Sequence, residues 1–197
     1  WLPRRDDGKG TEIQSLPGAC LSLDTLIPLL DGRTLSILEI EDELRNGKQL
    51  WAYSCNPKTG GFAPGLITWA GVTRKNEKVM KITLDNDKTI VCTYDHKFPL
   101  PNGQMTEARN LREGQSLIPF YTREKRLFKN SNYLQLFDNE TKDWEFVHRL
   151  VSNLYPNDYW YQDPTEKKNL VHHLDYDRRI NNPDNLVRMG FKDHRKM

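Results

Sequence analysis

The sequence contains little cysteine, little net charge and no long apolar run. Its three cysteines, Cys20, Cys55 and Cys92, are too few and too scattered for a disulfide framework, and no Cys-x-x-Cys pair is present to hold structural zinc. Lys and Arg number 29 against 27 Asp and Glu, so charge alone points to neither a nucleic acid nor an acidic partner. The longest apolar runs, such as residues 26–30, fall far short of the roughly 18 residues that a membrane span needs. We therefore expect a soluble protein of a reducing, intracellular compartment, without a membrane partner.

The length of the chain is enough for one ordinary domain or two small ones. The chain has 197 residues, of which 37% are apolar and 10% aromatic, so a collagen-like or wholly disordered protein is excluded. It opens at Trp1 instead of a Met, without the features of a signal peptide, and stops at Met197 in a basic run. We expect both ends to be cuts within a longer protein.

Three segments differ in composition. Residues 1–19 are polar and without periodicity, so we do not expect them to form a core alone. Residues 20–122 consist of short β-branched and aromatic runs between turn-forming pairs such as Asn-Gly and Gly-Gly, which is typical of an all-β domain. Residues 123–197 begin with a basic connector and carry most of the histidines. The composition therefore predicts a mainly β protein with a boundary near residue 122.

Two local elements follow from the residue pattern. In residues 79–93, apolar and polar side chains alternate on either side of an Asp-Asn-Asp turn, which predicts a β-hairpin. Residues 36–44 are predicted to be helical, because Ser36 is placed to cap a helix in which Ile40 and Leu44 share one face.

Cys20, Thr93 and His96 form the first candidate catalytic group. A cysteine attacks a carbonyl when it is activated and when a neighbouring group holds or protonates the leaving amide. Cys20 begins the β region, and Thr93 and His96 follow the predicted hairpin, where a strand end can present a hydroxyl and an imidazole to one point. Taken singly, such residues more often serve packing or surface roles, and packing is our prediction for Cys55 and Cys92.

Two stretches of this region resemble inteins, which are self-splicing protein insertions. Residues 20–27, Cys-Leu-Ser-Leu-Asp-Thr-Leu-Ile, resemble the first splicing block of that family. Residues 92–98, Cys-Thr-Tyr-Asp-His-Lys-Phe, resemble a second block with a Thr-x-x-His core. The resemblance covers roughly residues 20–120 and implies a horseshoe-like all-β splicing domain.

The resemblance also implies a reaction. Cys20 would attack the carbonyl of Ala19 in an autocatalytic N-to-S acyl shift, which forms a thioester. His96 would bind and protonate the scissile amide nitrogen, which is general-acid work, and Thr93 would help to hold the bond. Asp95 would orient His96.

The second candidate group lies in residues 171–186, Val-His-His-Leu-Asp-Tyr-Asp-Arg-Arg-Ile-Asn-Asn-Pro-Asp-Asn-Leu, followed by His194. Phosphodiester hydrolysis needs a base that makes hydroxide and a cation that stabilises charge, and a neutral histidine can be that base. The spacing resembles HNH homing endonucleases, which implies a small α+β domain with a ββα-metal site. In that resemblance His173 is the general base, Asn185 orients its imidazole, and His172 and His194 hold one divalent ion, Mg²⁺ or Mn²⁺.

The implied substrate of this second domain is double-stranded DNA. A Val-His-Arg-Leu-Val run at 147–151 looks like a segment that often precedes the HNH motif, and we expect a structural role for its His148. By composition alone the Asn-Asn-Pro-Asp-Asn run is also an ordinary turn. Few residues follow Gly190, which leaves open whether the nuclease is complete. The basic residues that could contact DNA phosphates are Arg149, Arg178, Arg179, Arg188 and Lys192.

The His-Asn dipeptide with which inteins finish splicing does not occur in the sequence. The resemblance therefore implies the N-terminal portion of an intein, whose partner would be a C-terminal portion in cis or in trans. Residues 1–19 would flank it as host sequence, and they resemble the portal protein of T4-like tailed phages. That places the protein in the cytoplasm of an infected bacterium, with the host protein in the virion. Two alternatives stay open: a stand-alone HNH nuclease with a passive β DNA-binding module, and a phage portal protein fragment with an inactive insertion.

Overall fold

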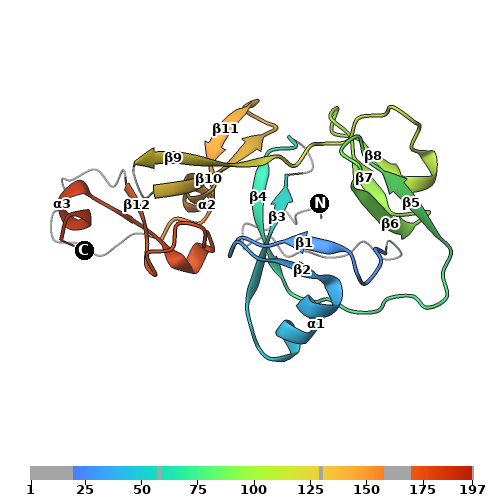
Figure 1. The fold of residues 1–197 in the computed structure, drawn as a ribbon, viewed down its shortest axis with the longest axis horizontal. Helices are drawn as coiled ribbons and strands as arrows, with labels where there is room; N and C mark the ends of the chain where they lie inside the picture. Colours follow the sequence, from blue (N-terminus) through green and yellow to red (C-terminus); the bar gives the residue numbers. More distant parts are fainter. Residues whose placement is uncertain (1–19, 57–58, 129–130, 158–169, 197) are drawn as a thin grey trace. The chain divides into compact units, whose positions relative to one another are not determined.

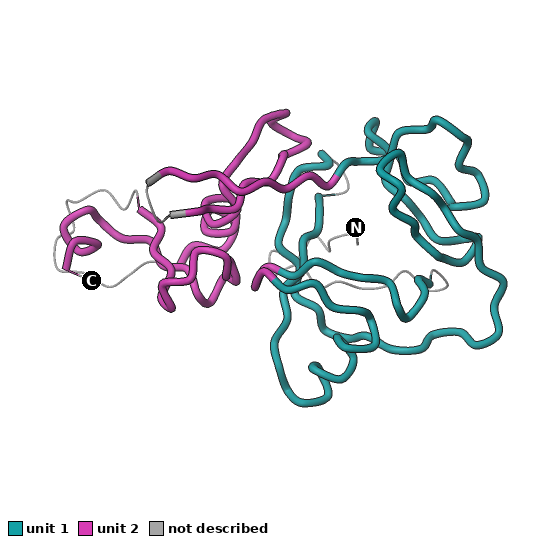
Figure 2. Tube along the Cα trace, viewed as in Figure 1, with its two compact units in different colours: residues 1–29, 33–119 teal, residues 30–32, 120–197 magenta. Residues whose placement is uncertain are grey.

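The structure, a computed structural model, describes residues 20–56, 59–128, 131–157 and 170–196. Ala19 and the rest of the 1–19 segment lie outside the described residues. Strands predominate (Figure 1), so the prediction of a mainly β protein is confirmed. The chain forms two compact units (Figure 2), residues 1–29 with 33–119 and residues 30–32 with 120–197. In the described part of the chain, no helix has the length and apolar character that a membrane crossing requires.

The first unit is built from antiparallel pairs of short strands. These strands are β1 (Leu26–Pro28), β2 (Thr34–Ser36), β3 (Leu50–Cys55), β4 (Phe62–Ile67), β5 (Val79–Thr83), β6 (Thr89–Thr93), β7 (Lys97–Pro99) and β8 (Met105–Glu107), with a short 3₁₀ turn at Ala108–Asn110. Each strand pairs with its neighbour in sequence, as β1–β2, β3–β4, β5–β6 and β7–β8. In the β5–β6 pair Val79 lies opposite Thr93 and Thr83 opposite Thr89, which confirms the hairpin predicted for residues 79–93.

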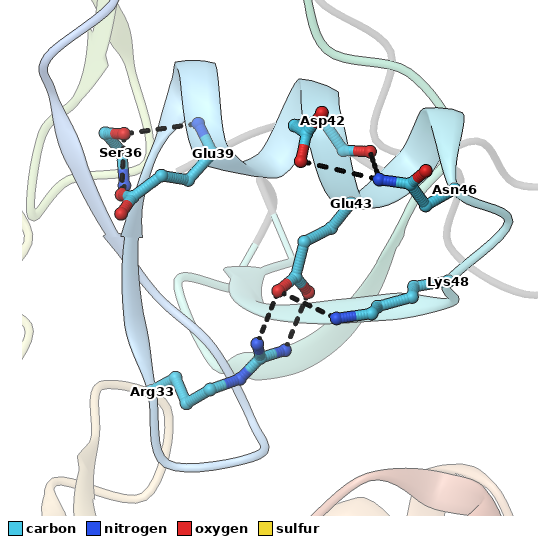
Figure 3. A network of polar contacts seen from close by, with 7 residues as sticks. All are labelled: Arg33, Ser36, Glu39, Asp42, Glu43, Asn46 and Lys48. Atoms are coloured by element: carbon cyan, nitrogen blue, oxygen red, sulfur yellow. Dashed lines mark hydrogen bonds and ion pairs between the residues drawn. The ribbon is translucent and has the colours of Figure 1, made fainter.

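Helix α1 (Ile37–Arg45) confirms the helix predicted at 36–44, and its caps explain its limits. The Ser36 hydroxyl accepts a hydrogen bond from the Glu39 amide at 3.2 Å, while Glu39 accepts one from the Ser36 amide at 2.7 Å (Figure 3). This reciprocal pair satisfies two amides that a helix start otherwise leaves unpaired. The Arg33 guanidinium makes two hydrogen bonds to Glu43, at 2.7 and 3.0 Å. These bonds join the turn between β1 and β2 to the helix.

Among the residues that the structure describes, two apolar clusters lie in the first unit. One joins α1 to the β3–β4 pair, and its buried members are Leu29, Ile40, Leu50, Ala52 and Ile67. The other packs among β6, β7 and the 3₁₀ turn, and its buried members are Cys92, Phe98 and Ala108. Cys55 is buried as well, so the packing prediction for both cysteines is confirmed. Burial raises the pKa of each of these two thiols to about 11, which leaves them protonated at neutral pH.

The second unit contains two sheets and two helices. Its elements are β9 (Thr122–Phe128), β10 (Ser131–Asp138), β11 (Asp143–Phe146), α2 (Val147–Leu154), β12 (Leu170–His173), a 3₁₀ turn (Pro183–Asn185), β13 (Leu186–Met189) and α3 (Phe191–His194). β10 lies between β11 and β9 in one antiparallel sheet, and β12 pairs with β13 in the other. Helix α2 contacts both sheets and buries Val147 and Val151 completely.

The segment expected to be a basic connector is strand β9. Its charged side chains do not prevent pairing, because they have partners across the sheet. The Nε atom of Arg123 donates to Gln135 at 2.9 Å, and its guanidinium lies 4.1 Å from the centre of the Trp144 ring. A cation over an aromatic face is an attractive contact that keeps the charge accessible to water.

Candidate functional sites

The main chain of Cys20 is held by the end of strand β6. The Thr93 amide donates to the carbonyl oxygen of Cys20 at 3.0 Å, and the Ser22 amide donates to the carbonyl of Val91 at 2.9 Å. Leu21 and Cys92 form an antiparallel bridge between these two bonds. Residues 20–22 therefore run beside β6 as a short extra strand, which brings Cys20 and Thr93 together across 73 residues of sequence.

The Thr93 hydroxyl contacts the nitrogen of Cys20 directly. The Cys20 amide donates to Thr93 Oγ1 at 3.1 Å, and the Thr93 residue is only 2% exposed. This nitrogen belongs to the peptide bond between residues 19 and 20. In acyl transfer to the Cys20 thiol, it is the atom that leaves. The Thr93 hydroxyl therefore lies within hydrogen-bond distance of that nitrogen.

His96 lies on the same tight turn as Thr93. Its backbone amide donates to the Thr93 carbonyl at 3.1 Å, and its ring meets the edge of Phe98 with centroids 5.0 Å apart. Burial lowers the pKa of His96 to about 4, although the nearby Asp95 opposes this shift. The imidazole is therefore neutral at pH 7. Its Nδ1 atom is buried and has no hydrogen-bond partner in the described part of the chain.

Two further residues of this site were missed from the sequence. The Sγ atom of Cys20 lies 2.7 Å from the hydroxyl of Thr73, and the next residue, Arg74, donates to Asp95 at 3.0 Å. Thr73 and Arg74 belong to the segment between β4 and β5, which has no motif and is far from Cys20 in sequence. Asp95, which we expected to orient His96, contacts Arg74. Hydrogen bonds from the Thr93 hydroxyl and from Arg74 hold the pKa of the Asp95 carboxyl below its usual range.

The β12–β13 pair and helix α3 carry the histidines of the second group. His172 lies opposite Val187 and His173 opposite Leu186, so the two adjacent imidazoles point to opposite faces of the pair. The rings of His172 and His194 meet edge to face with centroids 5.2 Å apart. Burial lowers the pKa of His172, and repulsion from His194 adds to this.

This imidazole pair has the donor chemistry of a metal site. Imidazole nitrogens suit borderline ions such as Ni²⁺, Cu²⁺ or Zn²⁺, whereas Mg²⁺ and Mn²⁺ prefer oxygen ligands. Among the described residues, no third His, Cys, Asp or Glu joins a cluster with them.

Asn181, rather than the predicted Asn185, contacts the imidazole of His173. The Nε2 atom of His173 lies 3.3 Å from Asn181 Oδ1, and the Nδ2 atom of Asn181 donates to the Arg179 carbonyl at 2.9 Å. Because that second bond fixes the amide orientation, an acceptor oxygen faces the ring, and Nε2 must carry the proton. Nδ1 is then the basic atom. Burial lowers the pKa of His173, which keeps the ring neutral at pH 7, although the Asn181 contact opposes this shift.

Asn185, predicted to orient the His173 ring, makes its described side-chain hydrogen bonds within the loop. Asn185 accepts from the Asp175 amide at 3.1 Å and donates to the Ile180 carbonyl at 2.8 Å. It lies in the turn just before β13, where its side chain reaches across the loop instead of toward the β12 face. It therefore holds the loop that carries Asn181, and acts on His173 through that loop.

His148 lies against the other side of His173. It is 7% exposed, and its ring centroid is 5.4 Å from that of His173 and 5.0 Å from that of Tyr133. Burial lowers the pKa of His148 to about 3. Arg178 donates to the Tyr133 hydroxyl at 3.1 Å, so this aromatic cluster connects strand β10 to the loop after His173.

The basic residues expected to contact DNA are spread over the second unit. Arg178 and Arg179 line an open groove of about 790 Å³ together with Arg126 of β9, which the sequence did not single out. Arg179 is paired with Asp177 at 2.8 Å and holds the pKa of that carboxyl at about 2. Arg149 and Lys192 are exposed on α2 and α3, and Arg188 is half-buried on β13.

Comparison with known proteins gives two relatives with different names. The chain is 36% identical over 181 residues to the DNA gyrase B protein of Synechocystis sp., an alignment that takes 90% of this chain and 16% of that protein. It is 26% identical over 136 residues to the Rpo1N component of the DNA-directed RNA polymerase of Methanocaldococcus jannaschii, which takes 68% of this chain and 9% of that protein. No protein-family model matches the chain. The chain thus resembles a small part of each of two large proteins whose names refer to DNA transactions.

Proposed function

We propose that this chain is the N-terminal portion of an intein that carries an HNH homing endonuclease. The observation that carries the splicing half is the hydrogen bond from the Cys20 amide to the Thr93 hydroxyl, at 3.1 Å. It joins the proposed nucleophile, the proposed leaving nitrogen and the Thr-x-x-His turn in one contact. A passive β module has no need of this arrangement.

The pattern of relatives supports the same proposal. A gyrase protein and a polymerase protein from different organisms each match this chain over a small share of their length, 16% and 9%. A segment that recurs inside proteins of different function behaves as an insertion would. A domain needed for gyrase or polymerase work would not be expected in both.

The proposed acyl shift exchanges a C–N bond for a C–S bond and moves one proton. The Cys20 sulfur forms a bond to the carbonyl carbon of residue 19, and the bond from that carbon to the Cys20 nitrogen breaks. The thiol proton ends on the nitrogen, which becomes an amine. Because His96 is neutral at pH 7, it cannot begin as the acid: it takes the thiol proton first and then delivers it. Thr93 keeps the nitrogen oriented during this transfer.

A thiol-cleavage experiment tests the splicing half. Incubation of the whole chain with dithiothreitol should release residues 1–19, as detected by mass spectrometry, because the thiol exchanges with the thioester. Cys20→Ala should abolish this release, and Thr93→Ala should slow it. Thr89→Ala, an exposed position on the same strand β6, serves as the matched control and should release normally. Release that persists in Cys20→Ala would contradict the proposal, and absence of release from the wild type would favour the stand-alone nuclease or the inactive insertion.

The nuclease half rests on the tautomer of His173. With its Nε2 proton directed at Asn181, the neutral ring presents Nδ1 as a base that can take a proton from water. His172 and His194, on the opposite face of the β12–β13 pair from His173, would hold a divalent ion, which would stabilise the charge of a phosphate that reaches both faces. Arg126 and Arg178 line the open groove together with Arg179, which is ion-paired to Asp177, and would contact DNA phosphates there. Arg149, exposed on α2, would add a further phosphate contact.

Metal binding and DNA nicking test this half separately. Co²⁺ added to the metal-free protein should give a visible absorption band, which His172→Gln and His194→Gln should each remove and Arg195→Gln, a neighbour of His194, should retain. Plasmid nicking should require a divalent ion and disappear in His173→Ala. Nicking that survives EDTA would refute the single-metal scheme, while a Co²⁺ band without nicking would indicate a metal site that lacks nuclease activity.

A further inference from the structure

The thiol of Cys20 has a partner outside the Thr-x-x-His turn. Thr73 Oγ1 lies 2.7 Å from Cys20 Sγ, although the two residues are 53 positions apart. Either group can donate in this contact: the thiol hydrogen to the threonine oxygen, or the hydroxyl hydrogen to the sulfur.

The segment that carries Thr73 is fixed at several points. Arg74 pairs with Asp95 at 3.0 Å and with Glu77 at 3.7 Å. At Gly71 an added Cβ would lie 2.9 Å from the Trp69 ring and 3.2 Å from a Glu41 carboxylate oxygen, so no larger residue fits there without a shift. Thr73 itself is exposed, and these contacts hold the main chain on either side of it near Cys20.

The two threonines divide the work of holding Cys20. Thr93 fixes the main chain, through its amide to the Cys20 carbonyl at 3.0 Å and its hydroxyl to the Cys20 nitrogen at 3.1 Å. What remains free is rotation of the thiol about χ1, which has three staggered positions. Thr73 selects one of them.

We propose that Thr73 is a positioning residue that holds the Cys20 thiol in its reactive rotamer. The inference deepens the proposed acyl shift and rests on it. The Thr73 hydroxyl accepts from the thiol before the shift and rotates to donate to the sulfur once the proton has left for His96. It gains and loses no atom in the step.

Two substitutions separate the hydroxyl from the shape of the side chain. Thr73→Val keeps the branched shape without the hydroxyl, and Thr73→Ser keeps the hydroxyl. Thiol-induced release should fall about three- to tenfold in Thr73→Val, the range expected for one lost hydrogen bond. Thr73→Ser should restore most of the rate, and Thr89→Val should leave it unchanged. Equal rates in Thr73→Val and the wild type, or equal losses in Thr73→Val and Thr73→Ser, would overturn the proposal.

Infrared spectroscopy gives a readout that does not depend on splicing. The S–H stretch of Cys20 is isolated as the difference between the wild type and Cys20→Ser, which removes the bands of Cys55 and Cys92. It should move to higher frequency in Thr73→Val, where the thiol loses its acceptor, and stay in place in Thr73→Ser. An unchanged band in Thr73→Val would refute the contact itself. If the band shifts in Thr73→Val but the wild type releases nothing with thiol, the contact between Thr73 and Cys20 is supported and the proposed splicing function is contradicted.

Discussion

Acid should destabilise the second unit through His148. In the folded protein, burial, with smaller contributions from His173 and Arg149, lowers the pKa of this imidazole from 6.5 to about 3. Between these two values the unfolded chain binds a proton that the folded protein does not, so falling pH favours unfolding. The full stability is present above about pH 6.5 and is lost progressively toward pH 3. From pH 7 to pH 5 this one residue should remove about 2 kcal/mol from the free energy of unfolding.

Urea unfolding followed by tryptophan fluorescence measures this effect, with His148→Phe as the comparison. The phenyl ring suits a site formed by the rings of Tyr133 and Phe146, at 5.0 and 5.5 Å from His148, and it cannot bind a proton. The variant should lose about 2 kcal/mol less stability than the wild type between pH 7 and pH 5. His173 shifts in the same direction and contributes to both proteins alike. Identical pH dependence in the two proteins, repeated with His148→Gln, would refute the reasoning.

Three other predictions concern the caps, the thiols and the core. Ser36→Ala should lower the free energy of unfolding by about 1 kcal/mol, because one capping bond of α1 is lost, and an unchanged urea midpoint would contradict this. Iodoacetamide should modify Cys55 and Cys92 of the native protein about a hundredfold more slowly than Cys20, since both are buried and protonated; equal labelling by mass spectrometry would be the opposing result. Leu136→Ala, at a 1% exposed position of β10, should cost about 3 kcal/mol in urea unfolding, and a loss below about 1 kcal/mol would mean that the site collapses around the gap.

Local chemistry made part of the fold predictable. The Ser36–Glu39 capping pair lies within four residues, and the alternation in 79–93 is complete within one hairpin, so neighbouring residues contain the whole signal. Strand β9 was missed because its outward side chains are charged. The partners that make them acceptable in a sheet, such as Gln135 and Trp144, come from later strands. Such pairing across strands leaves no mark in a short window of sequence.

The sites divide in the same way. The sequence could name Cys20, Thr93 and His96 through motif spacing, since each lies within a short block. It could not name Thr73, whose segment has no pattern of its own and meets Cys20 only in the folded unit. In the second unit, Asn181 and Asn185 stand in one turn-forming run, and composition cannot decide which of them faces His173. That choice depends on the turn at Pro183–Asn185, which directs Asn185 across the loop.

The pairing of residues 20–22 with strand β6 has a consequence for what precedes it. On the C-terminal side of the junction, the hydrogen bonds that the structure describes join the main chain of Cys20 and Ser22 to β6. The first unit therefore fixes the position of the Cys20 nitrogen through β6. A different sequence ending at residue 19 would be joined to a nitrogen in the same position. Exchange of the segment before residue 20 should therefore change how fast the peptide bond between residues 19 and 20 reacts. It should not change where the unit holds the nitrogen of that bond.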